Sequence, residues 1–187
     1  MSARKPKRKT TRLPGDPSLK DDVERMIRVD HAGEYGAVRI YAGQLSVLGD
    51  KASGGAIRRM ADQEARHLAT FDKLIHERRV RPTALLPLWH VAGFALGVGT
   101  ALLGEKAAMA CTVAVEETID EHYAGQVERL GEDEPALGRT FEEFRQEELE
   151  HRDTALEKGA EQAPGYEVLT GVVKAGSRLA IWLSERI

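Results

Sequence analysis

Apolar residues recur every three or four positions through most of the 187-residue chain, a spacing that places them on one face of a helix. Glycine and proline interrupt this pattern at intervals, as they do at helix ends. The pattern predicts five amphipathic helices, over residues 19–48, 56–80, 105–130, from Pro135 to before the break at 163–165, and over 166–187.

One stretch departs from this pattern, because residues 82–104 contain no Asp, Glu, Lys or Arg. An uncharged run of this length reaches the usual threshold for a membrane-spanning helix, but Pro87, His90 and four glycines argue against one. We predict a helix that packs against the rest and dips into a membrane interface, with Trp89 near the lipid headgroups. The alternative is a wholly buried core helix. The amphipathic segment 166–187 either closes the bundle or lies on a membrane.

Four glutamates stand in the predicted inner stripes, where apolar residues are expected: Glu34, Glu64, Glu116 and Glu148. Burying an uncompensated carboxylate costs several kcal/mol, and a whole domain is stable by only about 5–15 kcal/mol. No set of four Lys or Arg residues shares these stripes. Two divalent metal ions would balance the four charges. The alternative is that these glutamates lie on the surface.

Two of these glutamates begin a Glu-x-x-His unit, which His67 and His151 complete. One such unit is weak evidence, but two of them, with one further Glu on each of two other helices, form the ligand set of a carboxylate-bridged di-metal centre. The residues support a site with mostly oxygen ligands and one imidazole per metal, which suits iron or manganese.

The order of the ligands along the chain indicates a degenerate internal repeat. Glu34 precedes Glu64 by 30 residues, Glu116 precedes Glu148 by 32, and residues 82–104 join the two halves. This is the one-crossover topology of ferritin-like bundles. The sequence therefore predicts an all-α, ferritin-like four-helix bundle with two additional apolar or amphipathic helices.

Several neighbours of the glutamates are candidates for supporting roles. Asp30 and Asp120 lie one turn from a stripe glutamate and could accept the outer N–H of a ligating histidine, although each could equally be solvated. Tyr123 either lines the site or is a core tyrosine with a satisfied hydroxyl. His31 faces inward but has no counterpart in the second half, so we place it outside the ligand set.

Composition adds limits on location and partners. The formal net charge is −3, which gives no reason to expect nucleic acid as a partner. The single cysteine, Cys111, excludes an intrachain disulfide and is expected to be a small buried hydrophobe. Residues 2–12 are basic without an acid and no apolar run follows them, so we predict a disordered tail over 1–18 before one domain over 19–187. The alternative for the tail is attraction to anionic lipid.

The chain resembles the demethoxyubiquinone hydroxylases of ubiquinone biosynthesis from about Val23 to Ile187. The resemblance is carried by long matches and not by a two-residue signature. They are Arg28-Val-Asp-His-Ala-Gly-Glu-Tyr-Gly36, Gln63-Glu-Ala-Arg-His67, Arg81-Pro-Thr83, the Gly- and Ala-rich apolar run, Ala110-Cys-Thr-Val-Ala-Val-Glu-Glu117, Glu147-Glu-Leu-Glu-His151 and Leu183-Ser-Glu-Arg186.

This resemblance implies a di-iron monooxygenase that hydroxylates the ring of demethoxyubiquinol with O2, using NADH or another external reductant. It implies that Glu64 and Glu148 bridge the two irons. His122 and Tyr123 match a His-Tyr pair that family members place near the quinone and the point of electron entry. The implied iron ligands are Glu34, Glu64, His67, Glu116, Glu148 and His151.

The resemblance also implies peripheral attachment to the quinone-bearing membrane. The first 20 residues do not look like a long mitochondrial transit peptide, which favours a bacterial protein on the cytoplasmic side of the inner membrane, or the mitochondrial inner membrane if the source is eukaryotic. Removing an isoprenoid tail from lipid costs about 0.8 kcal/mol per CH2, so segments 82–104 and 166–187 are expected to face the bilayer. Contacts with other ubiquinone-synthesis proteins and homo-oligomer formation are left open.

Two other functions compete with the hydroxylase. One is a ferritin-like iron-binding or storage protein, which works in solution and has no need of apolar helices at a bilayer. The other is a structural, membrane-bound partner in a quinone-synthesis complex that carries a vestigial metal site.

Overall fold

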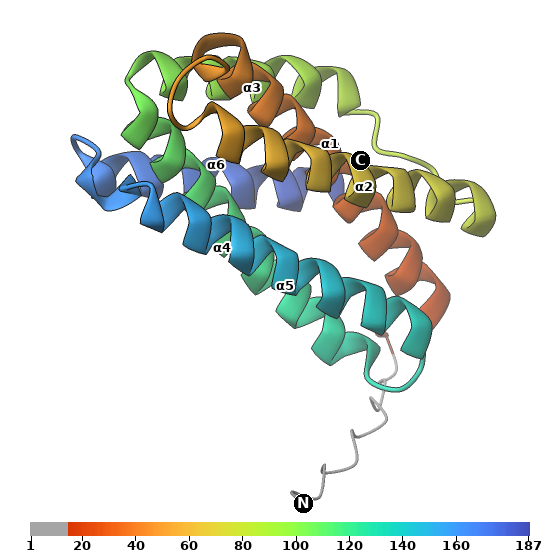
Figure 1. The fold of residues 1–187 in the computed structure, drawn as a ribbon. Coiled ribbons are helices and arrows are strands. Elements are labelled where there is room, and N and C mark those ends of the chain that lie inside the picture. Colours follow the sequence, from red (N-terminus) through yellow and green to blue (C-terminus); the bar gives the residue numbers. More distant parts are fainter. Residues whose placement is uncertain (1–14) are drawn as a thin grey trace, which may run out of the picture.

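The computed structural model describes residues 15–187, and within this range the chain forms six α-helices, one short 3-10 helix and no strand (Figure 1). The elements are α1 (Leu19–Leu48), α2 (Gly54–Arg78), α3 (Leu86–Leu102), α4 (Glu105–Leu130), α5 (Pro135–Glu157), η1 (Ala160–Gln162) and α6 (Tyr166–Ser184). The predicted all-α class is confirmed. The predicted basic tail falls mostly in residues 1–14, which lie outside the described part of the chain.

The helix boundaries follow local chemistry. Ser18 caps α1 by accepting a hydrogen bond from the Asp21 amide, and acidic residues in the first turn suit the positive end of the helix dipole. Pro135 opens α5, as the sequence predicts. The predicted bounds 19–48 and 105–130 match those of α1 and α4, whereas α6 ends three residues before the predicted end at Ile187.

The helices pair as the repeat predicts, α1 with α2 and α4 with α5, while α3 lies along α1 and α6 lies along α4 (Figure 1). The contact between α1 and α3 is unusually close. A Cβ atom on Gly43 would overlap the carbonyl oxygen of Phe94, and one on Gly97 would overlap that of Ile40. Gly93 and Gly97 of the uncharged segment therefore allow backbone-to-backbone packing of the crossover helix against α1. The predicted ferritin-like arrangement with two additional helices is confirmed.

The inner face of α2 shows how the core is arranged around the glutamates. Ile57 and Met60 belong to one apolar cluster and Phe71 to a second, with Glu64 and His67 between them. Apolar packing on both sides therefore holds the polar centre away from solvent. Cys111 is fully buried, as predicted, and burial raises the pKa of its thiol to about 12.

Helices α3 and α6 carry most of the exposed large apolar side chains. Val91 on α3 is 66% exposed and Val172 on α6 is 67% exposed, so the alternative of a wholly buried helix over 82–104 is wrong. Trp89 is half-buried, because its indole N–H donates to Ser184 Oγ at 3.0 Å, and Trp182 is instead the exposed tryptophan. None of the helices in residues 15–187 has the length and apolar character needed to cross a membrane.

Candidate metal centre

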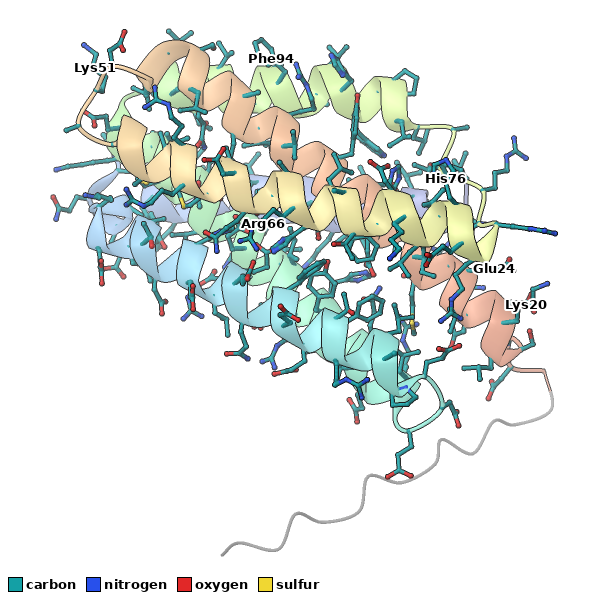
Figure 2. The ribbon with its side chains drawn as sticks, turned by 45° about the vertical axis from the view of Figure 1, so that its right-hand side comes forward. Lys20, Glu24, Lys51, Arg66, His76 and Phe94 are labelled. Atoms are coloured by element: carbon teal, nitrogen blue, oxygen red, sulfur yellow. The ribbon has the colours of Figure 1, made fainter. Side chains whose placement is uncertain are left out.

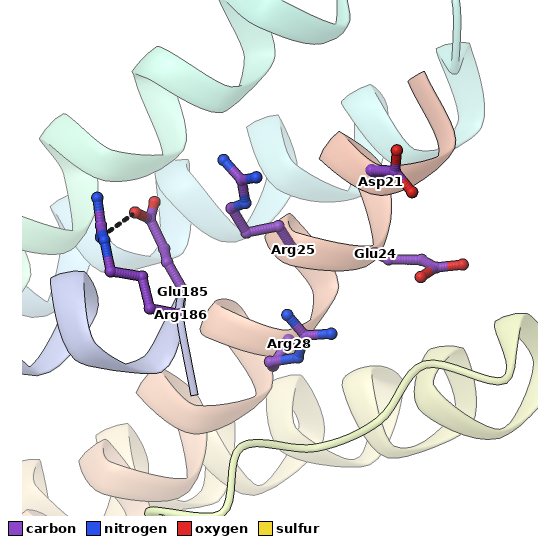
Figure 3. A pocket seen from close by; sticks show the side chains of 6 residues that line it. All are labelled: Asp21, Glu24, Arg25, Arg28, Glu185 and Arg186. Carbon is purple, nitrogen blue, oxygen red and sulfur yellow. Dashed lines mark hydrogen bonds and ion pairs between the residues drawn. The ribbon is translucent and has the colours of Figure 1, made fainter. Parts of the chain in front are cut away.

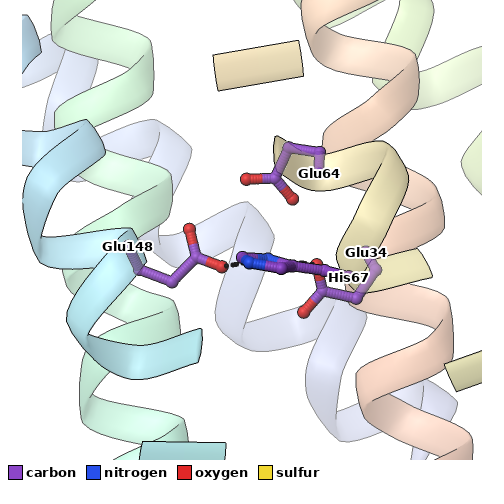
Figure 4. A group of neighbouring side chains, drawn as sticks. All are labelled: Glu34, Glu64, His67 and Glu148. Carbon is purple, nitrogen blue, oxygen red and sulfur yellow. Dashed lines mark ion pairs between the residues drawn. The ribbon is translucent and has the colours of Figure 1, made fainter. Parts of the chain in front are cut away.

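The six predicted ligands converge in the middle of the bundle, and each is at most 2% exposed. The alternative of surface glutamates is therefore wrong. The residues form two overlapping groups in which the potential ligand atoms all lie within 4.8 Å of one another. The first group is Glu34, Glu64, His67 and Glu148 (Figure 4), and the second is Glu64, Glu116, Glu148 and His151.

The shared members come from opposite hairpins. In Figure 4, Glu64 on α2 and Glu148 on α5 approach the same space from two sides, with His67 beside them. Only these two residues belong to both groups, so they are the two that could contact both metal positions.

The polar atoms of the centre have a shortage of hydrogen-bond partners. Both carboxylate oxygens of Glu64 are buried without a hydrogen bond from the described residues, as are Glu148 Oε1 and His67 Nδ1. Leaving a buried polar group unsatisfied costs about 1–3 kcal/mol, so several such atoms pointing at one space call for a cation. The donor set therefore fits divalent metal ions, and its oxygen-rich composition suits iron or manganese.

Each histidine turns its Nδ1 atom toward the centre. His67 Nδ1 lies 3.1 Å from Glu148 Oε1, and His151 Nδ1 lies 3.1 Å from Glu64 Oε1. The Nε2 atoms face outward and meet an acceptor on the opposite hairpin: His67 Nε2 lies 2.6 Å from Glu147 Oε2, and His151 Nε2 lies 3.1 Å from Gln63 Oε1.

This contact corrects the prediction that aspartates support the ligating histidines. Asp30 instead accepts hydrogen bonds from Gln126 and His122, and Asp120 pairs with Arg145 at 2.6 Å. The supporting residues are the ones directly before each motif glutamate, Gln63 and Glu147. In both copies of the motif a residue that can accept a hydrogen bond precedes the glutamate. Only the arrangement of α2 opposite α5 shows that this residue reaches the histidine of the other hairpin.

Two tyrosines bond in the same reciprocal way to Glu34 and Glu116, the terminal glutamates, each of which belongs to only one of the two groups. Tyr123 donates to Glu34 Oε1 at 2.5 Å, and Tyr41 donates to Glu116 Oε1 at 2.6 Å. Each tyrosine lies seven residues after the glutamate of its own half and serves the glutamate of the other half. Tyr123 therefore lines the site and also has a satisfied hydroxyl. Tyr41 was not predicted as a site residue, although its seven-residue offset repeats that of Tyr123.

Burial sets the protonation of the metal-free centre. It raises the pKa of Glu64 and of Glu116 well above the usual glutamate value, and the neighbouring Glu148 carboxylate raises both further. For His67, burial lowers the pKa, but the Glu148 and Glu34 carboxylates beside its Nδ1 atom outweigh burial and bring the pKa to about 11. Burial lowers the pKa of His151. Metal binding must therefore release protons from this site.

A polar network adjoins the centre on the Glu34 side. His122 Nε2 lies 3.2 Å from Asp30 Oδ1 and 2.9 Å from Gln126 Nε2. The His122 side chain is 15% exposed, whereas that of Asp30 is 1% exposed, so the network runs from the buried interior to the surface. His31 lies outside the ligand groups, as predicted, and pairs with Asp72 on α2. The predicted catalytic role of His122 and Tyr123 stays a prediction.

Two hollows open near the bundle. An apolar cavity of about 320 Å³ lies among α1, α3, α4 and α6, with Ala32, Ile40, Trp89 and Val115 in its wall. A polar cleft of about 430 Å³ lies where α1 passes the end of α6 (Figure 3). Three acids and three arginines line this cleft, so it carries no net charge: Asp21, Glu24, Arg25, Arg28, Glu185 and Arg186.

Comparison with known proteins places the chain in a family. The family model described as "Ubiquinone biosynthesis protein COQ7" matches residues 21–184. The 3-demethoxyubiquinol 3-hydroxylase of Rhodospirillum rubrum is 63% identical over 177 residues, which cover 94% of this chain and 84% of the relative. The human mitochondrial NADPH-dependent 3-demethoxyubiquinone 3-hydroxylase is 57% identical over 169 residues, covering 88% and 78%.

A more distant relative agrees. The mitochondrial 5-demethoxyubiquinone hydroxylase of Saccharomyces cerevisiae is 43% identical over 182 residues, which cover 88% of this chain and 78% of the relative. The family predicted from the sequence motifs is therefore confirmed, and this chain belongs to the COQ7 family of ubiquinone biosynthesis proteins, whose relatives named above are hydroxylases.

Proposed function

We propose that this chain is a di-iron monooxygenase that hydroxylates the ring of 3-demethoxyubiquinol with O2. The observation that carries the proposal is the pair of overlapping, buried Glu/His groups with unsatisfied oxygens at their centre. The named activity of relatives up to 63% identical supports the choice of substrate and reaction.

In this proposal each iron has its own terminal ligands. Glu34 and His67 would hold one iron, Glu116 and His151 would hold the other, and Glu64 and Glu148 would be shared between them. When bound and reduced by the external donor, the iron pair would supply the electrons for activation of O2.

The remaining residues of the chain orient the ligands and protect the site. Tyr41 and Tyr123 hold the terminal glutamates in place by their hydroxyl donors. The apolar clusters on either side, which include Met60 and Phe71, exclude water from the centre. Exclusion of water strengthens every electrostatic contact inside the site.

The quinol is proposed to arrive from a membrane. The apolar cavity among α1, α3, α4 and α6 suits a ring with an isoprenoid tail, and its wall includes Val115, the residue next to Glu116. The exposed apolar side chains of α3 and α6 suit peripheral attachment to the bilayer that holds such a substrate. We propose the cytoplasmic face of a bacterial inner membrane as the location, or the mitochondrial inner membrane in a eukaryote.

The reductant is proposed to be a nicotinamide nucleotide, NADH or NADPH. The human relative is named as NADPH-dependent, which supports this class of donor. The His122 network is the proposed side of electron entry, because it joins the surface to Asp30 and lies beside Tyr123.

A product assay tests the proposal. Full-length protein is loaded anaerobically with Fe(II) and mixed with a short-tailed demethoxyquinol, O2 and NADH or NADPH. We expect about two irons per chain, as the six-ligand set predicts, and a ring-hydroxylated product. Full iron loading without ring hydroxylation would overturn the proposal.

The same preparation tests the alternatives. A storage protein would take up many irons per chain and form a large soluble shell, which iron titration and gel filtration detect. A vestigial site predicts that Glu148→Ala leaves whatever activity is measured unchanged, with circular dichroism as the check that the helical fold survives.

A further inference from the structure

The ligand types of the two metal positions match, and so do the tyrosines that bond to them, but the outer contact of each histidine differs. Each position has one terminal glutamate, and each of these accepts one tyrosine hydroxyl, at 2.5 Å for Glu34 and 2.6 Å for Glu116. The two bridging residues are common to both groups. The acceptors at the histidine Nε2 atoms differ, since one is the carboxylate of Glu147 and the other is the neutral amide of Gln63.

The carboxylate contact is also the shorter of the two, and neighbouring side chains hold both of its partners in position. His67 Nε2 lies 2.6 Å from Glu147 Oε2, and Arg66 Nη2 lies 3.5 Å from the same oxygen. Arg66 is labelled in Figure 2, where α2 faces α5. The ring of Phe144 stacks on the His67 ring with the centroids 4.0 Å apart, which fixes the plane of the imidazole. The His67 ring is therefore held against a charged acceptor.

A charged acceptor changes what the histidine gives to a metal. A hydrogen bond to a carboxylate is roughly twice as strong as one to a neutral group, and pulling on the outer N–H raises the basicity of the ligating nitrogen. An amide oxygen does this much less. The imidazole of His67 is thus the stronger electron donor, and that of His151 is the weaker one.

We propose that Glu147 and Gln63 are positioning residues that make the two metal positions unequal, so that the metal held by His67 binds more tightly and is oxidised more readily than the metal held by His151. This inference rests on the proposed di-metal site. It adds that the internal repeat produces two chemically unequal metal positions from the same ligand types, through one Glu/Gln difference at equivalent positions.

Mössbauer spectroscopy of full-length protein loaded anaerobically with ⁵⁷Fe(II) tests the inequality directly. Wild-type protein should give two distinct quadrupole doublets of equal area. Glu147→Gln gives both histidines an amide acceptor, and Gln63→Glu gives both a carboxylate, so each change should bring the doublets together. The double exchange, Gln63→Glu with Glu147→Gln, should separate them again.

Cobalt titration gives a second readout that needs no turnover. Glu147→Gln should weaken binding of the first Co(II) ion by about tenfold, the low end of the usual effect of losing such an outer partner. Glu150→Gln is the matched control, because it removes one negative charge from an exposed position on the same helix and should leave the first binding step unchanged. Circular dichroism confirms that each variant is folded.

The outcomes separate this inference from the proposed function. Wild-type protein that binds fewer than two ions per chain would contradict the metal site itself, and both proposals fail. Two bound irons whose doublets coincide in the wild type, or stay equally separated in Glu147→Gln and Gln63→Glu, overturn the inequality alone. A Glu150→Gln effect as large as that of Glu147→Gln would also overturn it, since the cause would be net charge.

Discussion

The halves of the bundle, α1 with α2 and α4 with α5, supply the same ligands but different surroundings. Four residues before the terminal glutamate, the first half has Asp30 and the second has Thr112. Six residues after it, the first half has Ile40 and the second has His122. The polar residues Asp30 and His122 bond to each other, whereas Ile40 lines the apolar cavity.

The comparison shows that a degenerate repeat can keep the residues of a buried site the same in both halves while the residues around the site differ. Positions that contact the centre directly keep their chemistry in both halves, because the charge of the site has to balance. Positions one layer farther out differ: Asp30 and His122 form a polar network, whereas Ile40 lines an apolar cavity whose wall also includes Gly33 and Val115, the neighbours of Glu34 and Glu116. Under the proposed function, electrons and quinol therefore approach the metals through different sets of residues, the polar network and the apolar cavity.

The largest expected effect comes from the shared glutamates. Glu64→Gln or Glu148→Gln removes a ligand from both positions, so iron per chain should fall from about two to well below one. Glu34→Gln or Glu116→Gln touches one position and should leave about one iron. Elemental analysis after desalting measures the difference. Asp30→Asn is the control, and equal iron content in all variants would contradict the ligand assignment.

The metal-free protein should lose stability as the pH rises. The pKa values of Glu64 and Glu148 are raised by burial above the usual 4.5, so the folded chain binds protons that the unfolded chain releases. Their stabilisation is complete below about pH 4.5 and is lost as the pH passes the raised values. His67, with a pKa of about 11 against the usual 6.5, acts in the same direction between those two values, while the lowered pKa of His151 opposes it.

Urea unfolding between about pH 5 and pH 9 measures this slope, which is about 1.4 kcal/mol per pH unit for each net proton. Protein loaded with Fe(II) under nitrogen should show a much flatter profile, because the cations hold the carboxylates in their charged form. A flat profile for the metal-free protein would contradict the assigned pKa directions.

The two tyrosines test whether the halves contribute equally to the free energy of unfolding but unequally to hydroxylation. Tyr41→Phe and Tyr123→Phe each remove one buried hydrogen bond, so each should lower the free energy of unfolding by about 1–2 kcal/mol. Urea unfolding of the two variants checks this. Under the proposed electron entry, Tyr123→Phe should slow hydroxylation more than Tyr41→Phe does, and an equal slowing would contradict the difference between the halves.

The smallest expected effects concern the two approach routes. His122→Gln should change the KM for the reductant by about fivefold, as expected for roughly 1 kcal/mol of lost hydrogen bonding. The iron content should stay unchanged. Ile40→Thr should raise the KM for a short-tailed quinol and leave the reductant dependence unchanged. Steady-state kinetics with each substrate varied in turn separates them. If both variants affect the same substrate, the proposal of two separate routes is wrong.

Much of the centre could be predicted because charged residues are rarely buried, and these glutamates recur at the helical spacing of the apolar stripes. Glu34 and Glu116 could be paired with the two Glu-x-x-His units from helical spacing and charge balance alone. The residues that bond to the outer nitrogens of the histidines could not be identified this way. Asp30 lies one turn from a ligand along its own helix, but the histidines turn their outer nitrogens toward the opposite hairpin, where Gln63 and Glu147 lie.

Local patterns also left the outer helices ambiguous. The uncharged run over 82–104 fits a buried, interfacial or spanning helix, since periodicity reports one apolar face and not what covers it. The close packing of Gly43 and Gly97 assigns the inner face of α3, and the exposure of Val91 assigns the outer one. Trp89 was expected to face outward, but it bonds to Ser184 on α6, a contact between residues 95 positions apart.

The sequence by itself determined the helices, the repeat and the six residues of the centre, because each depends on spacing within one helix and on the need to neutralise buried charge. Only the tertiary structure decided which partner each ligand has. Tyr41 and Tyr123 each serve the other half's glutamate, and Gln63 and Glu147 each serve the other half's histidine. These contacts depend on how the two hairpins face each other, and no pattern along a single helix carries that information.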